Sequence, residues 1–251
     1  MRGSLMFQAR TKADTLKELI AIVSTLVDEA KFSISSEKIT LRAVDPAHVA
    51  MLDVQLKKDA FEEYKADEVD LGVDVAKIDQ FLRLARAGDI VDLAHDEDKR
   101  RLNVIVGNTT KRMSLIDTTG MTEPKVPNLN LPAKVSLNIE DIMQGIRASE
   151  SVSDHVALVA TPEYFELICE GDTDQVQLKL AKDQLVELEA KEKARSLFPL
   201  EYFSNIMKSV PSGTKLTFSL GVDYPVKIEF SIAGENGEVK YFLAPRIESG
   251  D

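Results

Sequence analysis

The chain has 251 residues, of which 44% are hydrophobic and 29% charged, and its mean hydropathy is -0.12. This profile is typical of a folded globular protein, and no run approaches the roughly 18 apolar residues that a membrane span requires. The formal net charge of -11 argues, by itself, against nucleic acid as a partner. Net charge does not report where charges lie, so a local basic lining stays possible.

The residues for catalysis and metal binding are sparse. The single cysteine, Cys169, excludes an intrachain disulfide, and the three histidines show no metal-ligand spacing. The stretch 117–120, DTTG, lacks the glycine spacing and lysine of a phosphate-binding loop. The carboxylates at 96–98 are followed by three basic residues and are typical of a solvated hairpin tip. We therefore expect no metal, no cofactor and no enzyme, with a cytosolic α+β enzyme as a remote alternative.

The first elements are a strand, a helix and three strands. Residues 1–4 read MRGS, which is typical of an added leader, so we expect residues 1–5 to be an extension and the native chain to begin at Met6. Apolar residues from Leu16 to Val27 recur at helical spacing, and Thr15 and Glu18 have the spacing of a capping box. Strands are predicted at 7–11, 31–35, 38–44 and 49–56.

The same order of elements recurs three times. The second cycle has a strand from 69, a helix over 75–87, and strands at 90–94, 102–106 and 112–116. The third has strands at 133–138, 155–160, 164–170 and 175–181 and a helix over 140–149. The fourth has strands at 185–190, 215–220, 226–233 and 238–243 and a helix over 199–209. Four such units predict an α+β protein of two similar domains. Each domain would contain two helices covering one face of eight strands paired as antiparallel meanders.

A connector separates the two halves. Residues 117–132, DTTGMTEPKVPNLNLP, contain three prolines and one glycine and show neither helical nor strand periodicity. The expected domains are therefore 6–116 and 133–247. Because the connector keeps Met121, Val126 and Leu129, we expect it to lie on a surface rather than extend freely into solvent.

Basic side chains recur on the outer faces of the predicted helices. They are Lys17, Lys77, Arg83, Arg86, Arg147 and Lys208. Acidic residues such as Glu18 and Asp79 are interspersed with them, so an ordinary solvated helix surface is an equally good interpretation of this pattern alone.

Four segments carry a resemblance to a known family. The stretches MFQAR, EAKFSISSEKITLRAVDPAHVAML, MSLID and KYFLAPRI occur in the same order and at the same separations as in proliferating cell nuclear antigen, and the likeness extends from Met6 to Ile247. The chain is more similar to archaeal than to eukaryotic members. The resemblance implies two DNA-clamp domains, with helices packed on antiparallel sheets, and head-to-tail assembly into a homotrimeric ring of pseudo-sixfold symmetry.

The resemblance also implies where the ring meets DNA and where it closes. The basic helix residues would face duplex DNA, encircled without regard to sequence. Edge strands near 109–116 and 174–181 would pair between subunits. The interface residues implied are Thr109, Lys111, Met113, Leu115, Gln175, Gln177 and Lys179. Lys111 and Arg112 fit either this interface or the basic interior.

A third implied site is a pocket for partner peptides of the form Gln-x-x-aliphatic-x-x-aromatic-aromatic. The residues that match its lining are Val44, His48, Val49, Met51, Val126, Pro127, Pro225, Phe242, Leu243, Ala244 and Pro245. Taken singly, Val44 and Met51 are better explained as core residues and His48 as a turn residue, with Asp45 and Pro46 setting that turn. Phe242 stands where many relatives have tyrosine.

The implied function is that of a DNA polymerase processivity factor in replication and repair. The implied partners are a second and third copy of the chain, a clamp loader, DNA polymerase, flap nuclease and DNA ligase, and no membrane. The expected location is cytoplasmic, at the nucleoid in an archaeon, or nuclear in a eukaryote. A subunit of a heterotrimeric or checkpoint clamp is the alternative, although two complete edge strands favour a homotrimer.

Overall fold

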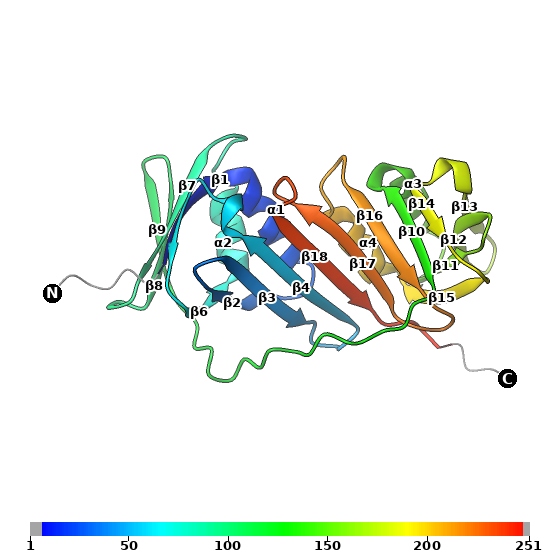
Figure 1. The fold of residues 1–251 in the computed structure, drawn as a ribbon, viewed down its shortest axis with the longest axis horizontal. Coiled ribbons are helices and arrows are strands. Elements are labelled where there is room, and N and C mark those ends of the chain that lie inside the picture. Colours follow the sequence, from blue (N-terminus) through cyan, green and yellow to red (C-terminus); the bar gives the residue numbers. More distant parts are fainter. Residues whose placement is uncertain (1–6, 248–251) are drawn as a thin grey trace. The chain divides into compact units, whose positions relative to one another are not determined.

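The computed structural model describes residues 7–247, which form two compact units (Figure 1). The first unit contains the chain up to Pro46, Leu52–Lys125 and Ile232–Val239. The second contains Ala47–Met51, Val126–Ser231 and the chain from Lys240 onward. The extension expected at residues 1–5, and Met6 itself, lie outside the described residues.

The first half of the chain contains nine strands and two α-helices, with a 3-10 turn at Lys58–Ala60. They are β1 (Phe7–Lys12), α1 (Ala13–Val23), β2 (Glu29–Ile34), β3 (Lys38–Val44), β4 (Ala50–Lys57), β5 (Glu63–Ala66), β6 (Val69–Asp74), α2 (Val75–Leu82), β7 (Ile90–Asp96), β8 (Arg101–Val106) and β9 (Thr109–Ser114).

The second half repeats this series element by element, with its own 3-10 turn at Lys182–Gln184. Its elements are β10 (Ala133–Asn138), α3 (Ile139–Ser149), β11 (His155–Ala160), β12 (Tyr164–Glu170), β13 (Gln175–Ala181), β14 (Glu187–Glu189), β15 (Ala194–Pro199), α4 (Leu200–Ser209), β16 (Lys215–Leu220), β17 (Val226–Ile232) and β18 (Gly237–Leu243).

The strand orders show that the two halves share one topology. The strands of the first repeat are ordered β5-β1-β7-β8-β9 and β4-β3-β2-β6. Those of the second are ordered β14-β10-β16-β17-β18 and β13-β12-β11-β15, which is the first order with nine added to each number. Every pairing for which the register is known is antiparallel. The prediction of a repeated fold with antiparallel sheets is confirmed.

Three details of the predicted architecture are wrong. Each repeat has nine strands rather than eight, because β5 was missed and the predicted strand 185–190 is the short β14, followed by the missed β15. The strands are not simple meanders, since β1 lies between β5 and β7, and β2 pairs with β6. Third, the strands of each repeat form two series rather than one set covered by both helices. In the first repeat, α1 contacts β1 of one series and α2 contacts β2 of the other.

The helix ends also differ from the predictions. The structure begins α1 at Ala13, with no side-chain cap, so the predicted capping box of Thr15 and Glu18 is wrong. The Ala13 N–H instead donates to the Asp89 carbonyl at 2.7 Å, which means that tertiary structure satisfies this helix end. The α1 helix ends at Val23 rather than 27, and α2 ends at Leu82 rather than 87.

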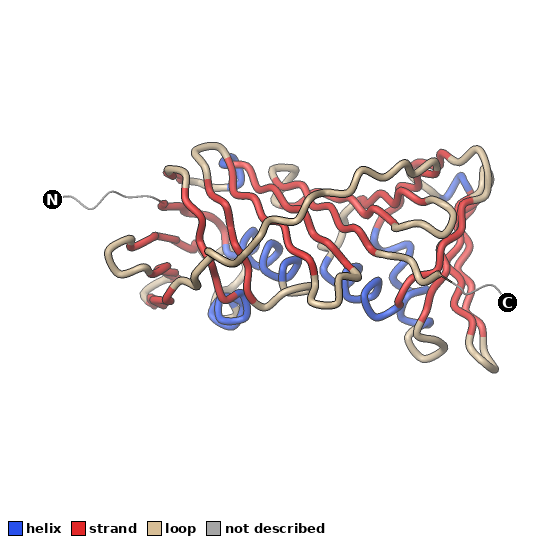
Figure 2. The backbone as a smooth tube through the Cα atoms, turned by 90° about the horizontal axis from the view of Figure 1, so that it is seen from below, coloured by secondary structure: helices blue, strands red, loops and turns tan. Residues whose placement is uncertain are grey.

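Strand β9 ends at Ser114, two residues before the predicted end. Leu115 still lies opposite Arg100, and its N–H donates to that carbonyl at 3.0 Å, whereas the Ile116 N–H donates to the Gly72 carbonyl at 2.8 Å. Ile116 thereby ties the start of the connector to β6. Residues 117–132 then contain no helix or strand (Figure 2).

One ion-pair chain holds the connector within the first unit. The Arg42 side chain on β3 contacts Asp53 of β4 at 3.0 Å and Glu123 of the connector at 3.1 Å. The Asp53 side chain is only 8% exposed, so its charge needs the Arg42 partner. The first half of the connector is thus attached to the sheet by an ion pair rather than by the apolar residues from which we expected attachment.

We predict that Gly72→Ala destabilises the first unit by about 1–3 kcal/mol, the usual range for overpacking. A Cβ atom at Gly72 would lie 2.4 Å from the Ile116 carbonyl oxygen, so the backbone would have to move. Thermal unfolding of purified protein measures the loss. Gly120→Ala is the matched control, because no atom lies within 4 Å of a Cβ at that position. Equal melting temperatures for the two variants would contradict the prediction.

Candidate functional site

The two helices of each repeat pack against each other, α1 with α2 and α3 with α4. Four of the six basic residues predicted to face DNA lie on these helices, namely Lys17, Lys77, Arg147 and Lys208. Arg83 and Arg86 lie in the turn after α2, so the prediction that they share a helix face is wrong. Arg83 is 76% exposed and Lys77 is 62% exposed at the side chain, whereas Lys17 is half-buried. Most of this set is therefore accessible, and Lys17 is the exception.

Four of the six basic groups are engaged within the protein. The Lys17 ammonium donates to the Ala85 carbonyl at 2.6 Å, at the end of α2. The other three contact carboxylates: Lys77 with Asp74 at 2.6 Å, Arg83 with Asp79 at 2.7 Å and Lys208 with Glu150. The Asp74 hydrogen bond raises the pKa of Lys77, and the hydrogen bonds from Lys208 and Ser204 lower the pKa of Glu150.

Arg86 and Arg147 differ from this group. Among residues 7–247, neither guanidinium has a carboxylate within 4.0 Å. Both side chains are exposed. The helix faces therefore combine neutralised cations with two open ones, an arrangement that favours a weak attraction for polyanions over tight binding.

The predicted interface segments are both edge strands. Strand β9 ends the order β5-β1-β7-β8-β9, and β13 ends the order β13-β12-β11-β15. On β9, Met113 is buried in the first unit, and the Lys111 ammonium donates to the Lys77 carbonyl at 2.8 Å. Thr109 is exposed and Leu115 is half-buried just beyond the strand.

The predicted residues of β13 lie against the neighbouring strand. Gln175 donates to Glu170 at 3.0 Å, Gln177 donates to Glu166 at 2.9 Å, and the Lys179 ammonium lies 3.2 Å from the same Glu166. The opposite face of β13 carries Val176 and Leu178, which are half-buried apolar residues on an edge strand. The sequence prediction did not include them, although their alternation with polar residues in QVQLKLA places them on one face of the strand.

Two other strands of the chain, β4 and β18, pair with each other. The Lys57 N–H donates to the Asn236 carbonyl at 2.8 Å within the first unit, and the Ala244 N–H donates to the Val49 carbonyl at 2.9 Å within the second. Both bonds lie where β4 and β18 are neighbours. In the other repeat, β13 corresponds to β4 and β9 corresponds to β18. Strands β4 and β18 pair with each other, whereas β13 and β9 are not paired with each other within the chain.

The predicted pocket residues come from four stretches of the sequence, and all but Val44 belong to the second unit. The segment Ala47–Met51 is the informative case, because it comes from the first half of the sequence and clusters with residues of the second half. The hydrogen bond from Ala244 to Val49 joins it directly to the C-terminal segment.

Burial divides the pocket residues into two classes. Met51, Phe242 and Leu243 are buried and contribute to the core. The exposed members are His48, Val126 and Pro127. Val49, Pro225, Ala244 and Pro245 are half-buried, as is Val44 of the first unit. His48 is exposed and has a φ of 57°, a left-handed conformation in the turn between β3 and β4. The accessible set is apolar apart from His48, as a surface for a hydrophobic peptide requires.

Residues 7–247 contain no group of three His, Cys, Asp or Glu side chains that could hold a metal ion, and no helix there is long and apolar enough to cross a membrane. Asp96 accepts from the Lys99 N–H at 3.1 Å in the turn between β7 and β8, which confirms the predicted hairpin tip. Cys169 is buried, and burial raises the pKa of its thiol.

Comparison with known proteins identifies the family. The N-terminal domain model of proliferating cell nuclear antigen matches residues 6–122, and the C-terminal domain model matches residues 125–246. The chain belongs to the proliferating cell nuclear antigen family. This family membership replaces the remote alternative of an enzyme, because the curated relatives are named as sliding clamps.

Relatives and solved structures agree with this membership. The DNA polymerase sliding clamp of Methanosarcina barkeri is 43% identical over 97% of this chain and 100% of its own, and that of Halobacterium salinarum is 40% identical over the same shares. The solved structure of A. fulgidus PCNA bound to the C-terminal region of FEN-1 has a TM-score of 0.92 and 34% identity, covering 98% of this chain and 100% of that one. PCNA from Thermococcus kodakaraensis has a TM-score of 0.90 and 28% identity, covering 96% and 100%.

Proposed function

We propose that this protein is a homotrimeric sliding clamp. It would encircle duplex DNA as a processivity factor and tether DNA polymerase and other partners through the peptide pocket. The observation that carries the proposal is the repeated strand order, in which β4 and β18 are joined within the chain while their equivalents β13 and β9 remain free edges. The curated relatives are named DNA polymerase sliding clamps, which supports the same conclusion.

Ring closure follows from the need to pair those edges. An edge strand presents unpaired backbone N–H and C=O groups, and a heterologous contact satisfies them in every copy if the rotation closes. Three copies of a chain with two repeats contain six repeats, which matches the pseudo-sixfold ring expected from the sequence. Val176 and Leu178 would add apolar area to the contact.

The role of the helices would be to line the hole with modest positive charge. A closed ring is linked to DNA by topology, so it needs no strong phosphate contact, and strong contacts would impede sliding. The partial neutralisation of Lys77, Arg83 and Lys208 suits this role. Arg86 and Arg147 would supply the remaining attraction.

The peptide pocket would be the tethering site. The A. fulgidus relative was solved with the C-terminal region of FEN-1, a terminal segment of a partner, which supports recruitment through a short peptide. We extend this to polymerase, flap nuclease, ligase and the clamp loader as partners, and to a location with the DNA, in the cytoplasm at the nucleoid. A subunit of a heterotrimeric ring remains the second candidate, and the presence of both free edges in one chain favours self-assembly.

We expect the purified protein to be a trimer in size-exclusion chromatography with multi-angle light scattering, at three times the chain mass of 27.8 kDa. Val176→Asp should give monomers, because an unpaired charge would be placed in the contact. Val222→Asp, at a side chain that is 62% exposed, is the matched control. A wild-type protein that stays monomeric at micromolar concentration would contradict the proposed homotrimer.

The triple variant Arg83→Ala, Arg86→Ala, Arg147→Ala should remain trimeric but bind duplex DNA more weakly. Each phosphate contact releases a counterion from the DNA, so the loss of three contacts should reduce the magnitude of the slope of log affinity against log salt by up to about 3. Fluorescence anisotropy with a labelled duplex across a salt series measures it. A matched triple variant of Lys57, Lys58 and Lys191 to alanine is the control. The assignment fails if the helix variant loses the trimer and leaves the DNA slope unchanged.

Val126→Asp should weaken binding of a synthetic peptide of the form Gln-x-x-aliphatic-x-x-aromatic-aromatic by about tenfold or more, since burial of a valine contributes about 1.5–3 kcal/mol. Ring assembly should survive, because Val126 is exposed. Asn128→Asp adds the same charge two residues away and is the control. Calorimetric titration measures the peptide affinity of each variant. Undiminished binding to the Val126 variant would show that the pocket lies elsewhere.

A further inference from the structure

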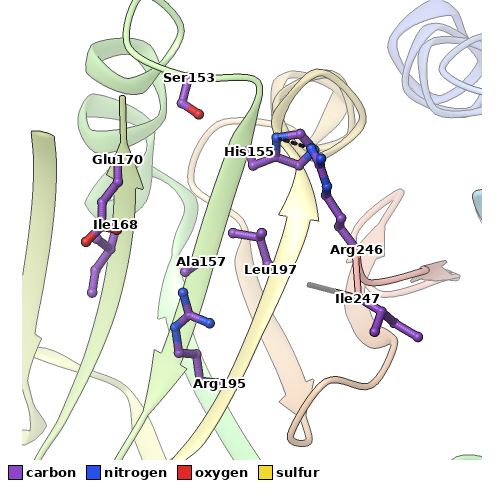
Figure 3. A pocket seen from close by; sticks show the side chains of 9 residues that line it. All are labelled: Ser153, His155, Ala157, Ile168, Glu170, Arg195, Leu197, Arg246 and Ile247. Carbon is purple, nitrogen blue, oxygen red and sulfur yellow. Dashed lines mark hydrogen bonds between the residues drawn. The ribbon is translucent and has the colours of Figure 1, made fainter. Parts of the chain in front are cut away.

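A cavity of about 380 Å³ lies along strands β12, β11 and β15 in the second unit (Figure 3). It is polar, unlike the peptide pocket. The side chains that define its chemistry are Ser153, His155, Glu170, Arg195, Leu197 and Arg246. We call this cavity the Arg246 subsite.

Arg246 is held in place at both its backbone and its side chain. Its N–H donates to the Leu197 carbonyl at 2.7 Å, and its guanidinium Nη1 lies 2.7 Å from Nε2 and 3.1 Å from Nδ1 of His155. Burial, followed by the charge of Arg246, lowers the pKa of His155, so the imidazole is a neutral partner. It orients the guanidinium without neutralising it, and no carboxylate within residues 7–247 lies within 4.0 Å of Arg246.

The first repeat contains the equivalent positions and provides an internal comparison. The strand registers align Gly72 with Leu197, and the isolated bridges align Ile116 with Arg246. They also align Asp70 with Arg195. The second repeat thus has two arginines where the first has an isoleucine and an aspartate.

The charges of the first repeat satisfy one another. Lys31 lies 3.7 Å from Asp70, and the Ser33 hydroxyl donates to the same carboxylate at 2.6 Å. Ile116 closes directly over Gly72, where there is no room for even a Cβ atom. The shared fold therefore does not require a cationic cavity, and its presence in the second repeat is a property of these particular residues.

The lining of the subsite has a net positive charge. Arg195 and Arg246 contribute two guanidinium groups, and Glu170 contributes one carboxylate. Glu170 accepts from Gln175 at 3.0 Å, which directs it toward β13. A cationic cavity in a chain of net charge -11 is a local exception, and it would attract an acidic group that the rest of the surface repels.

We propose that the Arg246 subsite binds a carboxylate side chain of a partner protein, adjacent to the peptide segment that occupies the pocket. This proposal rests on the proposed function, because Arg246 directly follows Ala244 and Pro245 of that pocket. Adjacent residues are at most about 3.8 Å apart at Cα, so one short peptide can reach both sites. A planar guanidinium matches a carboxylate in geometry and can bind it through two parallel hydrogen bonds.

The test uses four synthetic peptides with one shared motif, Gln-x-x-aliphatic-x-x-aromatic-aromatic. Two carry a pair of glutamates on either the N-terminal or the C-terminal flank, and two carry a pair of glutamines at the same positions. Against the wild-type trimer, one glutamate peptide should bind about three- to tenfold more tightly than its glutamine counterpart, the range for a charged pair at a partly exposed site. Calorimetric titration at low salt measures each affinity.

Variants of the protein separate recognition from structure. Arg246→Gln should abolish the preference for glutamate while leaving the glutamine peptides unchanged, Arg195→Gln should reduce it, and Arg246→Lys should retain part of it. Lys191→Gln, which removes an exposed cation of the same unit, should change nothing. If the wild type binds glutamate and glutamine peptides equally, the subsite alone is overturned. The subsite is also overturned if Arg246→Gln weakens the affinity for all four peptides equally. Failure of every peptide to bind the wild-type trimer overturns the pocket itself and the subsite with it.

Discussion

The hydrogen-bonding capacity of strand edges is the constraint on which the rest of this structure depends. Each repeat ends its two strand series in exposed backbone, and an unpaired edge in water invites pairing with another chain. Within the chain, one such pair is joined where Lys57 meets Asn236 and Val49 meets Ala244. Among the remaining sheet edges, β9 and β13 hold the same positions in their repeats as the joined strands β18 and β4. The self-assembly that we propose would therefore follow from the repeat itself.

The distribution of charge fits the loose encirclement of DNA that we propose. The chain is strongly acidic, yet its helices carry the basic residues, and nearby carboxylates or a carbonyl engage most of them. Such pairs keep cations on the helix face while limiting their strength, since an exposed ion pair is weak and screened by salt. The Arg246 subsite differs from these ion pairs, because a neutral histidine orients its guanidinium and leaves the positive charge uncompensated.

Local patterns predicted most of the elements and failed where distant residues intervene. The apolar stripe of α1 is a property of neighbouring residues, so its existence followed from spacing alone. Its start did not, because the Ala13 N–H is satisfied by Asp89, far along the chain. The strands β5 and β15 were missed since EYKA is too short and polar to show alternation, and ARSLFP follows a charged run without a turn residue.

The sequence by itself determined the repeat, the connector, the family and the identity of the basic and apolar residues, because these depend on order, spacing and composition. Only the tertiary structure decided which of those residues meet. Ala47–Met51 joins the second unit through a backbone hydrogen bond to Ala244, and Arg246 reaches His155 across 91 positions. Such contacts are set by strand register, and a register is a property of two segments together that neither segment specifies alone.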